Sequence, residues 1–283
     1  MTAMMQYRHF HQQLQHIYNQ QEAGIITDWV FQKITGKQRS AIIKNPDEDV
    51  AETVSIKLAS CLADLMQHKP VQYVLGEAWF YKMKLKVNEQ VLIPRPETEE
   101  LVQWIADDTK NTMPHSILDI GTGSGCIAIA LKKKLPAADV IAIDVSVGAL
   151  ALANENAATQ DTPIDFLQMD FLDEASWKAL PLFDIIVSNP PYIPEAEKDL
   201  LDKNVSAYEP HTALFVPDAD PLLFYKKIAA FGLSHLNSGG KIFMETHAQF
   251  AKQTAAYFST CYPIVEIKKD LQERERMVMA VLL

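Results

Sequence analysis

The chain has 283 residues, of which 48% are hydrophobic and 22% charged, so it is long enough for two domains with separate apolar cores. Its formal net charge of -10 argues against broad binding to a nucleic-acid backbone, which requires clustered Lys and Arg side chains. Polar residues interrupt every apolar run, and the amphipathic N-terminal stretch lacks a signal-peptide pattern, so we expect a cytoplasmic protein that does not contact membranes.

The three cysteines, Cys61, Cys126 and Cys261, lie far apart and form no paired pattern. Neither a disulfide framework nor a zinc site is therefore expected, and buried thiols are the simplest interpretation. We expect no bound metal.

The first part of the chain has apolar residues three and four positions apart, the spacing of one helix face. These residues are Phe10, Leu14 and Ile17, followed by Val50, Val54, Leu58, Leu62 and Leu65. We therefore predict a small helical domain over residues 1–75.

A change of pattern near Gly76 predicts a β-hairpin linker over residues 76–94. Its first strand would run through the aromatic and alternating residues 79–87, and its second strand over residues 91–93. The prolines that follow disfavour helix, so Thr98 is the expected cap of a helix over residues 101–106.

From residue 95 onward, strand and helix patterns alternate. Short apolar runs without alternation, typical of strands buried on both faces of a parallel sheet, occupy residues 117–120, 140–143 and 183–187. Further strands are predicted at 165–167, 241–245, 265–268 and 277–283, the last two as a closing hairpin. Helices are predicted at 126–134, 147–158, 221–236 and 248–259. This order indicates an α/β domain over residues 95–283, built on a doubly wound sheet.

A glycine-rich turn links the strand at 117–120 to the helix at 126–134. It comprises Gly121, Thr122, Gly123, Ser124 and Gly125. Glycine permits a positive φ and lets a ligand approach the backbone closely. A buried strand before the turn, an apolar helix after it and Asp144 at the end of the next strand are the context in which such a turn binds a nucleotide. An ordinary strand-to-helix turn without a ligand is the alternative.

Three positions indicate which nucleotide is bound. A dinucleotide fingerprint requires glycine where this chain has Cys126, which disfavours NAD and a dehydrogenase. Asp119 suits a ligand with a positively charged amino acid end, and Asp144 can accept the hydrogens of two ribose hydroxyls. These features fit S-adenosylmethionine as the cofactor and S-adenosylhomocysteine as the product.

Asp170 and Phe171 follow the predicted strand at 165–167, where an adenine would meet the edge of the sheet. Asp170 is a candidate acceptor for the exocyclic amine, and Phe171 is a candidate contact for the ring. A helix cap at Asp170 and a core phenylalanine explain the same two residues equally well.

The strand at 183–187 leads into Asn189-Pro190-Pro191-Tyr192, at the end where open α/β sheets bind ligands. The Asn189 side-chain oxygen and the Pro190 carbonyl would accept the two hydrogens of an amide or amine nitrogen and aim its lone pair at a methyl donor. Tyr192 would wall or stack against the planar group. The motif predicts N-methylation with Asn189, Pro190 and Tyr192 as catalytic residues, although Asn and Pro also favour a simple turn.

Five sequence blocks resemble the protein-(glutamine-N5) methyltransferases that modify peptide chain release factors, the HemK or PrmC family. The resemblance runs from Pro70 to the C-terminus. The blocks are PVQYVLGEAWF, LIPRPETEELV, ILDIGTGSGCIAIAL, SNPPYIP and YEPHTALF. The resemblance implies a seven-stranded Rossmann-like methyltransferase fold and methyl transfer from S-adenosylmethionine to the glutamine of a release factor's Gly-Gly-Gln loop.

The same resemblance assigns roles to individual residues. The turn at 121–125, Asp144 and Phe171 belong to the cofactor site, and residues 189–192 grip the substrate amide. Three more residues would line the same cleft: Arg95, Pro96 and Glu97. The N-terminal helical domain would help to dock the release factor, and we expect a monomer that does not bind nucleic acid directly.

Two positions depart from the family pattern. Thr246-His247 follows Glu245 where glycine is expected, and a glycine expected near Asp270 is replaced within Gln272-Glu273-Arg274. Both are expected at sheet edges, where they would change loop shape and leave the chemistry intact. We expect His247 to be a loop or packing residue.

Other functions are compatible with the same pocket. A glutamine of a ribosomal protein or the amino group of a nucleic-acid base would fit it, but a base must be flipped out by a positively charged module that the sequence lacks. A nucleotide-binding regulator without catalysis is a further alternative, against which the intact Asn189 argues.

Overall fold

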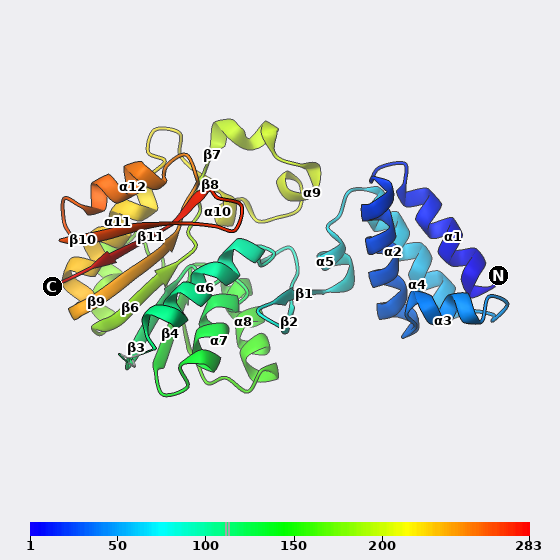
Figure 1. Cartoon of the computed structure of the whole chain (residues 1–283), viewed down its shortest axis with the longest axis horizontal. Helices are drawn as coiled ribbons and strands as arrows, with labels where there is room; N and C mark the ends of the chain where they lie inside the picture. The colour runs from blue at the N-terminus through cyan, green and yellow to red at the C-terminus, as the bar shows by residue number, and fades with distance from the viewer. Residues whose placement is uncertain (111, 113) are drawn as a thin grey trace. The chain divides into compact units, whose positions relative to one another are not determined.

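The computed structural model describes residues 1–110, 112 and 114–283. The chain forms two compact units, each with its own hydrophobic core (Figure 1). The first unit comprises Met1–Glu77 and Asp202–Tyr208, and the second comprises Ala78–Leu201 and Glu209–Leu283. The region expected to link two domains, residues 76–94, therefore falls almost entirely within the second unit.

Helices form the N-terminal part of the first unit, as the spacing of apolar residues predicts. They are α1 (Ala3–Leu14), α2 (Gln20–Thr35), α3 (Arg39–Lys44), α4 (Glu52–Met66) and α5 (Val71–Leu75). Leu14 of α1, Val30 of α2 and Leu65 of α4 are fully buried in one core. α1 and α2 each begin at a capping side chain, since Thr2 and Asn19 accept backbone hydrogens of the first turn.

The hairpin turns earlier than predicted. β1 (Glu77–Phe80) and β2 (Met83–Lys86) pair around a two-residue turn at Tyr81 and Lys82, whose φ angles are +48° and +63°. The predicted returning strand at residues 91–93 is wrong, because Ile93 donates its backbone N–H to Glu209 Oε2 at 3.0 Å. A buried carboxylate thus replaces a strand partner for this segment.

Among the described residues, a seven-stranded sheet forms the centre of the second unit and confirms the predicted α/β fold (Figure 1). Its strand order is β10-β11-β9-β6-β3-β4-β5. The strands are β3 (Ser116–Ile120), β4 (Asp139–Asp144), β5 (Asp165–Gln168), β6 (Phe183–Ser188), β9 (Leu236–Glu245), β10 (Ile264–Lys269) and β11 (Glu275–Val281). β11 is antiparallel to both β9 and β10, whereas the other neighbours pair in parallel, so the predicted closing hairpin is confirmed.

Helices cover both faces of this sheet. One face carries α6 (Pro96–Asp108), α7 (Cys126–Lys134) and α8 (Val147–Thr159), and the other carries α11 (Leu223–His235) and α12 (Ala251–Phe258). Successive strand residues enter the two different cores: Ile117 packs with α6 and α7, and Leu118 packs with α11 and α12. This arrangement explains why the central strands are apolar without alternation.

Shorter elements lie between these helices and strands. They are η1 (Glu174–Ala179), β7 (Ile193–Pro194), η2 (Glu195–Leu200), α9 (Lys203–Ser206), α10 (His211–Leu214) and β8 (Phe215–Val216). They complete the second unit, except for α9, which lies in the part of the first unit that spans Asp202–Tyr208. β7 and β8 pair in parallel, which joins the segment after the Asn189 motif to the segment after α10.

α6 begins earlier than predicted, and Thr98 is not its cap. The helix starts at Pro96, and Arg95 takes the capping position without a side-chain hydrogen bond. Proline is favoured at the first helical position because its fixed φ suits a helix and its missing N–H would be unpaired there. The Thr98 side chain is therefore free to point inward, where it is 2% exposed.

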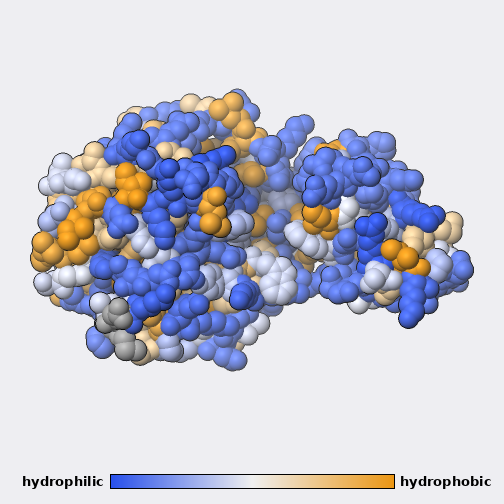
Figure 2. Space-filling model, viewed as in Figure 1, coloured by the Kyte–Doolittle hydropathy of each residue, from blue (hydrophilic) through white to orange (hydrophobic). Residues whose placement is uncertain are grey.

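The surface seen in Figure 2 is mostly hydrophilic, and the apolar side chains that reach it form small separate groups. None of the helices in the described part of the chain combines the length and the apolar character that crossing a membrane requires.

The turn between β10 and β11 holds a non-glycine residue in the left-handed region. Glu273 has a φ of +63°, and Asp270 Oδ1 accepts the backbone hydrogens of Gln272 and Arg274, each at 2.9 Å. The stretch in which the resemblance leads us to expect glycine thus contains a conformation that favours glycine. At the other departure, Thr246 donates its N–H to the Arg276 carbonyl at 2.7 Å, so the pairing of β9 with β11 continues past Glu245.

We predict that Glu273→Gly stabilises the second unit by about 0.5–1 kcal/mol, because relief of left-handed strain exceeds the entropy that glycine adds to the unfolded chain. The lost pair with Lys269 is exposed and contributes little. Thermal unfolding measures the change. Glu266→Gly, on the exposed side of β10, is the matched control and is expected to lower the melting temperature. A melting temperature that falls in both variants would contradict the prediction.

Candidate active site

A cavity of about 390 Å³ opens at the carboxyl ends of β3, β4 and β6, within the second unit. Its volume is in the range of small-molecule sites, and its position is the point where open α/β sheets bind ligands. Eleven of the predicted site residues line it: Arg95, Gly121, Thr122, Gly123, Ser124, Asp144, Asp170, Phe171, Asn189, Pro190 and Pro191.

The glycines of the turn serve two different purposes. Gly121 and Gly123 have φ angles of +71° and +55°, and a Cβ added to either would meet nothing within 4 Å. Their backbone is therefore open for close approach by a ligand. Gly125 is not among the residues that line the cavity, and a Cβ there would lie 3.2 Å from both Ala153 and Ile129 side-chain atoms. That glycine allows α7 and α8 to pack closely.

Asp144 joins the glycine turn to the end of β4. Its Oδ2 accepts the Gly123 N–H and its Oδ1 accepts the Ser146 N–H, both at 2.9 Å. Each carboxylate oxygen retains further acceptor capacity, and the residue lines the cavity. Asp144 is thus preorganised to accept hydrogens from hydroxyl groups of a ligand.

Asp119 lies one layer behind the cavity wall. It is fully buried, does not line the cavity, and accepts the hydroxyl hydrogen of Thr122 at 2.7 Å. Burial raises the pKa of Asp119 to about 7, the charge of Asp144 adds to this rise, and the Thr122 hydroxyl and the Ala128 N–H oppose it. Asp119 is therefore separated from the cavity by Thr122, which lines the wall, so direct contact of Asp119 with a ligand stays a prediction.

Asp170 and Phe171 line the cavity and also have structural contacts. Asp170 Oδ1 accepts the Leu172 N–H at 2.9 Å, which shapes the turn after β5. Phe171 is 6% exposed, stacks on Trp177 with ring centroids 5.4 Å apart, and meets Phe231 edge-on. Asp170 therefore stabilises a turn and Phe171 packs in the core, and both residues also line the cavity.

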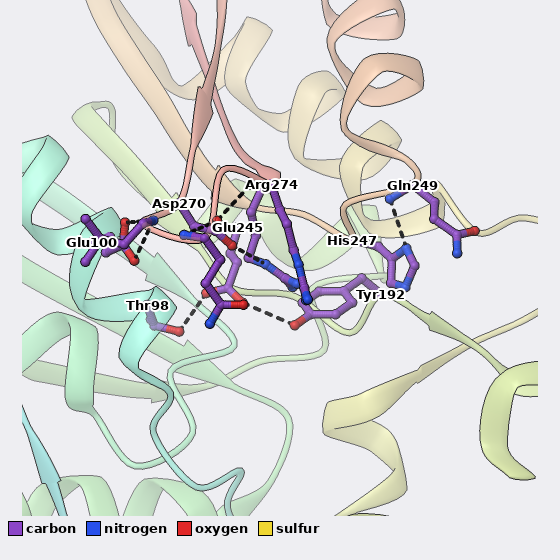
Figure 3. Close-up of polar contacts among 11 residues, drawn as sticks. Thr98, Glu100, Tyr192, Glu245, His247, Gln249, Asp270 and Arg274 are labelled. Atoms are coloured by element: carbon purple, nitrogen blue, oxygen red, sulfur yellow. Dashed lines mark hydrogen bonds and ion pairs between the residues drawn. The ribbon is translucent and has the colours of Figure 1, made fainter. Parts of the chain in front are cut away.

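Asn189 reaches the cavity from the end of β6. Its Nδ2 donates to Thr98 Oγ1 at 3.1 Å, and Pro190 and Pro191 continue the wall. Tyr192 does not line the cavity, contrary to its expected role as a wall. Its hydroxyl donates to Glu245 Oε1 at 3.2 Å, and Figure 3 shows the ring directed toward that carboxylate.

Glu245 is the buried group to which these side chains connect. It is 1% exposed at the end of β9 and accepts the Thr98 hydroxyl hydrogen at 2.6 Å (Figure 3). Burial raises the pKa of Glu245, while Thr98, Arg276 and Tyr192 oppose the rise. Burial and the charge of Glu245 in turn raise the pKa of Tyr192, so its hydroxyl keeps its proton.

The predicted Arg95-Pro96-Glu97 segment contributes one residue to the wall. Arg95 lines the cavity and forms an ion pair with Glu209, which is 3% exposed and also accepts the Ile93 N–H. Pro96 and Glu97 are not lining residues. The ion pair fixes the approach to α6 against the segment before α10.

Sequence reasoning missed the roles of Thr98, Glu209 and Glu245. Thr98 and Glu209 lie inside the sequence blocks that carry the resemblance, and Glu245 ends a predicted strand on the ligand-binding side. The strand position is a signal that could have identified Glu245. Thr98 and Glu245 are 147 residues apart in the chain, and Arg95 and Glu209 are 114 residues apart. Local sequence patterns do not predict pairs at such separations.

His247 packs beside the site and does not line the cavity, as expected. Its ring lies 5.9 Å from that of Tyr192 and 5.2 Å from that of Phe250, and its Nε2 is 3.5 Å from Glu197 Oε2. Burial lowers the pKa of His247, with Glu197 opposing this effect. Across the part of the chain that the structure describes, His, Cys, Asp and Glu side chains form no cluster of three that could hold a metal.

Two protein-family models match the chain. The methyltransferase small domain matches residues 98–206, and the PrmC N-terminal domain matches residues 7–76. The first match contains the glycine turn and the Asn189 motif, and the second covers most of the N-terminal helices.

Curated relatives match nearly the whole chain and are named release factor glutamine methyltransferase. The relative from Flavobacterium psychrophilum is 40% identical over 95% of this chain and 95% of its own length. The relative from Bacteroides thetaiotaomicron is 37% identical over 95% of this chain and 96% of its own length.

Solved methyltransferase structures share the fold. The Thermus thermophilus 16S rRNA N2 G1207 methyltransferase, in complex with AdoMet and guanosine, superposes with a TM-score of 0.52 at 14% identity, covering 73% of this chain and 50% of that one. A methyltransferase from Pyrococcus furiosus gives a TM-score of 0.50 at 16% identity, covering 71% and 89%. At such identities the similarity concerns the fold alone.

The raised pKa of Asp119 predicts a pH-dependent stability. Unfolded Asp119 releases its proton near its ordinary pKa of 3.8, whereas the folded group keeps it up to about pH 7. The native state therefore holds more protons between these values, and stability falls as pH rises through them. The contribution falls by about 3 kcal/mol between pH 5 and pH 8.

The measurement is the free energy of unfolding of wild type and Asp119→Asn over this pH range, without ligand. Other titrating groups are common to both proteins, so the difference between them isolates Asp119. The difference is expected to favour wild type at pH 5 and to shift toward the variant by pH 8. A difference that does not change with pH would contradict the assignment.

Proposed function

The chain belongs to the family of release factor glutamine methyltransferases, and from that premise we propose that it methylates the N5 amide nitrogen of the glutamine in a release factor's Gly-Gly-Gln motif. The observation that carries this proposal is the convergence of Asn189, Pro190 and the glycine turn at one cavity. Acceptors for an amide nitrogen and an open backbone for a cofactor thus share one wall.

Asn189 and Pro190 supply what an amide nitrogen needs. Its lone pair is delocalised into the neighbouring carbonyl, which makes it a poor nucleophile. The Asn189 side-chain oxygen and the Pro190 carbonyl each accept one N–H, which directs the lone pair into the cavity and stabilises positive charge as it develops on nitrogen. Proline fixes φ, and two successive prolines hold these acceptors in place. Tyr192 supports the motif through Glu245 and does not line the cavity.

The glycine turn and Asp144 hold S-adenosylmethionine, which supplies an electrophilic methyl group. The residues present fit this cofactor on two observations. Gly121 and Gly123 leave open space over their backbone, and Asp144 lines the cavity with a carboxylate that the Gly123 and Ser146 N–H groups hold in place. Thr122 and Ser124 complete the turn, while Asp170 and Phe171 border the adenine end. Asp119 supports Thr122 from behind the wall by accepting its hydroxyl hydrogen.

The first unit binds the release factor away from its glutamine loop. Support comes from the match to the PrmC N-terminal domain and from apolar side chains that α2 exposes. Ile25 is 43% exposed and Trp29 is 46% exposed, and large apolar side chains at a surface are typical of protein-binding sites. The enzyme acts as a monomer in the cytoplasm.

Mass spectrometry of a purified release factor before and after incubation with the enzyme and S-adenosylmethionine tests the proposal. One added methyl group on the Gly-Gly-Gln glutamine is expected. A methyl group on another residue, or on a ribosomal protein only, would replace the proposed substrate by the other amide that this pocket accommodates.

We predict opposite effects for two cavity residues. Asn189→Ala is expected to lower the transfer rate by about two to three orders of magnitude, the effect of removing one preorganised polar partner, with cofactor affinity nearly unchanged. Asp144→Ala is expected to weaken cofactor binding first. Calorimetry with S-adenosylhomocysteine and single-turnover rates separate the two effects. Full turnover by Asn189→Ala would show that alignment of the lone pair does not depend on this side chain.

A further inference from the structure

A closed hydrogen-bond network ties the two ends of the Asn189-Pro190-Pro191-Tyr192 motif together, and it runs from the cavity wall, which Asn189 and Thr98 both line, to the buried Glu245 and Tyr192 behind it. Asn189 Nδ2 donates to Thr98 Oγ1 at 3.1 Å, and Thr98 donates to Glu245 Oε2 at 2.6 Å. Tyr192 donates to the other oxygen of the same carboxylate at 3.2 Å. Figure 3 shows Thr98 and Tyr192 approaching Glu245 from different elements.

The direction of each hydrogen bond follows from the chemistry of the groups. Both Glu245 oxygens accept, so the carboxylate is the acceptor end of the network. Thr98 has a single hydroxyl hydrogen, and that hydrogen goes to Glu245. Only the lone pairs of Thr98 Oγ1 are left for Asn189, so Asn189 must contribute its NH₂ group there and not its oxygen.

The orientation of the Asn189 amide determines what it offers the cavity. Once Nδ2 is bound to Thr98, Oδ1 lies on the opposite branch of the planar group. Among the residues that the structure describes, no hydrogen bond to Oδ1 competes for it. Asn189 itself lines the cavity, and we infer that the Oδ1 left over by the bond to Thr98 is the acceptor it offers there.

The sheet holds in place the Glu245 carboxylate, which sets the direction of the hydrogen bonds from Thr98 and Asn189. Ser188 of β6 pairs with Met244 of β9, so the next residues, Asn189 and Glu245, leave the two strands side by side. Arg276 of β11, bound to Asp270 at 3.2 Å, attracts the Glu245 carboxylate, while Glu97 of α6 repels it. Thr98 lies in the first turn of α6 and is 2% exposed.

We propose that Thr98 and Glu245 are positioning residues that lock the Asn189 amide with its oxygen toward the cavity, so that the site selects a nitrogen bearing hydrogens over a carboxylate. This inference rests on the proposed function and extends it. Glutamine presents N–H groups to the locked oxygen, whereas glutamate presents only oxygens and is repelled. Thr98 at the wall and Glu245 behind it therefore contribute to specificity through the orientation of Asn189.

Thr98→Val tests the lock, because it keeps the shape of the side chain and removes the hydroxyl. The expected result is a loss of about 10²-fold in kcat, the effect of a misaligned reacting group, with less than about twofold change in S-adenosylhomocysteine affinity. Thr98→Ser restores the hydroxyl and is expected to recover most of kcat. Wild-type kcat in Thr98→Val would overturn the proposal.

Thr109→Val is the matched control. Thr109 is 3% exposed at the C-cap of α6, and its hydroxyl donates to the Ile105 carbonyl of that helix, away from the cavity. Its replacement removes a buried hydroxyl from the same helix and is expected to lower the melting temperature without lowering kcat. An equal loss of kcat in both variants would mean that Thr98 acts only through helix stability, which would overturn the proposal.

Glu245→Gln independently tests the direction of the hydrogen bonds that Thr98 forms. The new amide can donate to Thr98, which allows Thr98 to turn its own hydrogen toward Asn189. A loss of kcat similar to that of Thr98→Val is expected, and the double variant should lose no more than either single variant because both changes break one network. Fully additive losses would show that Glu245 does not act through Thr98.

A measurement without substrate separates this proposal from the proposed function. Hydrogen exchange of the Asn189 side-chain NH₂, followed by NMR in the full chain, is expected to be slow in wild type and at least tenfold faster in Thr98→Val. If slow exchange is seen but no release factor is methylated, the proposed function fails and the lock stands. If the release factor is methylated but Thr98→Val changes neither exchange nor kcat, the lock fails and the proposed function stands.

Discussion

A carboxylate buried inside a protein must find donors for its oxygens, and Glu245 meets this requirement where α6, β6 and β9 converge. One donor, Thr98, comes from the first turn of α6, and the other, Tyr192, follows β6. A cation from β11, Arg276, attracts the same charge. Each donor belongs to a different element, so a single buried group aligns all of them. Asn189 is positioned by this packed junction and not by a mobile loop.

The parallel sheet brings the two halves of the site together. Ile120 of β3 pairs with Ser188 of β6, so the next residues, Gly121 and Asn189, begin as neighbours at the same edge. The glycine turn then leaves its backbone open, while the prolines after Asn189 hold theirs rigid. The proposed site for a methyl donor and the proposed site for an amide thus become adjacent through strand register, although 68 residues separate Ile120 from Ser188.

The buried acidic groups around the site lower the stability of the folded state. Burial raises the pKa of both Asp119 and Glu245, so each charge opposes folding at neutral pH. Glu209 is likewise buried, and it binds Arg95 and the Ile93 backbone. A core built only for stability would replace such groups with apolar side chains. Their concentration around one cavity is typical of a functional site, where buried polar groups orient side chains for function and lower the stability of the fold.

Local patterns in the sequence determined the helices of the first unit, the buried strands such as residues 117–120, the glycine turn and the Asn189 motif. These features depend on residue spacing and on the backbone preferences of glycine and proline, both of which can be read from short stretches of sequence. Only the tertiary structure decided that Thr98 binds Glu245, that Tyr192 turns away from the cavity, and that Ile93 binds Glu209 in a segment that forms no strand. The partners in those contacts are distant in the chain, and a buried polar group selects its donor by proximity in the fold, which spacing along the sequence does not encode.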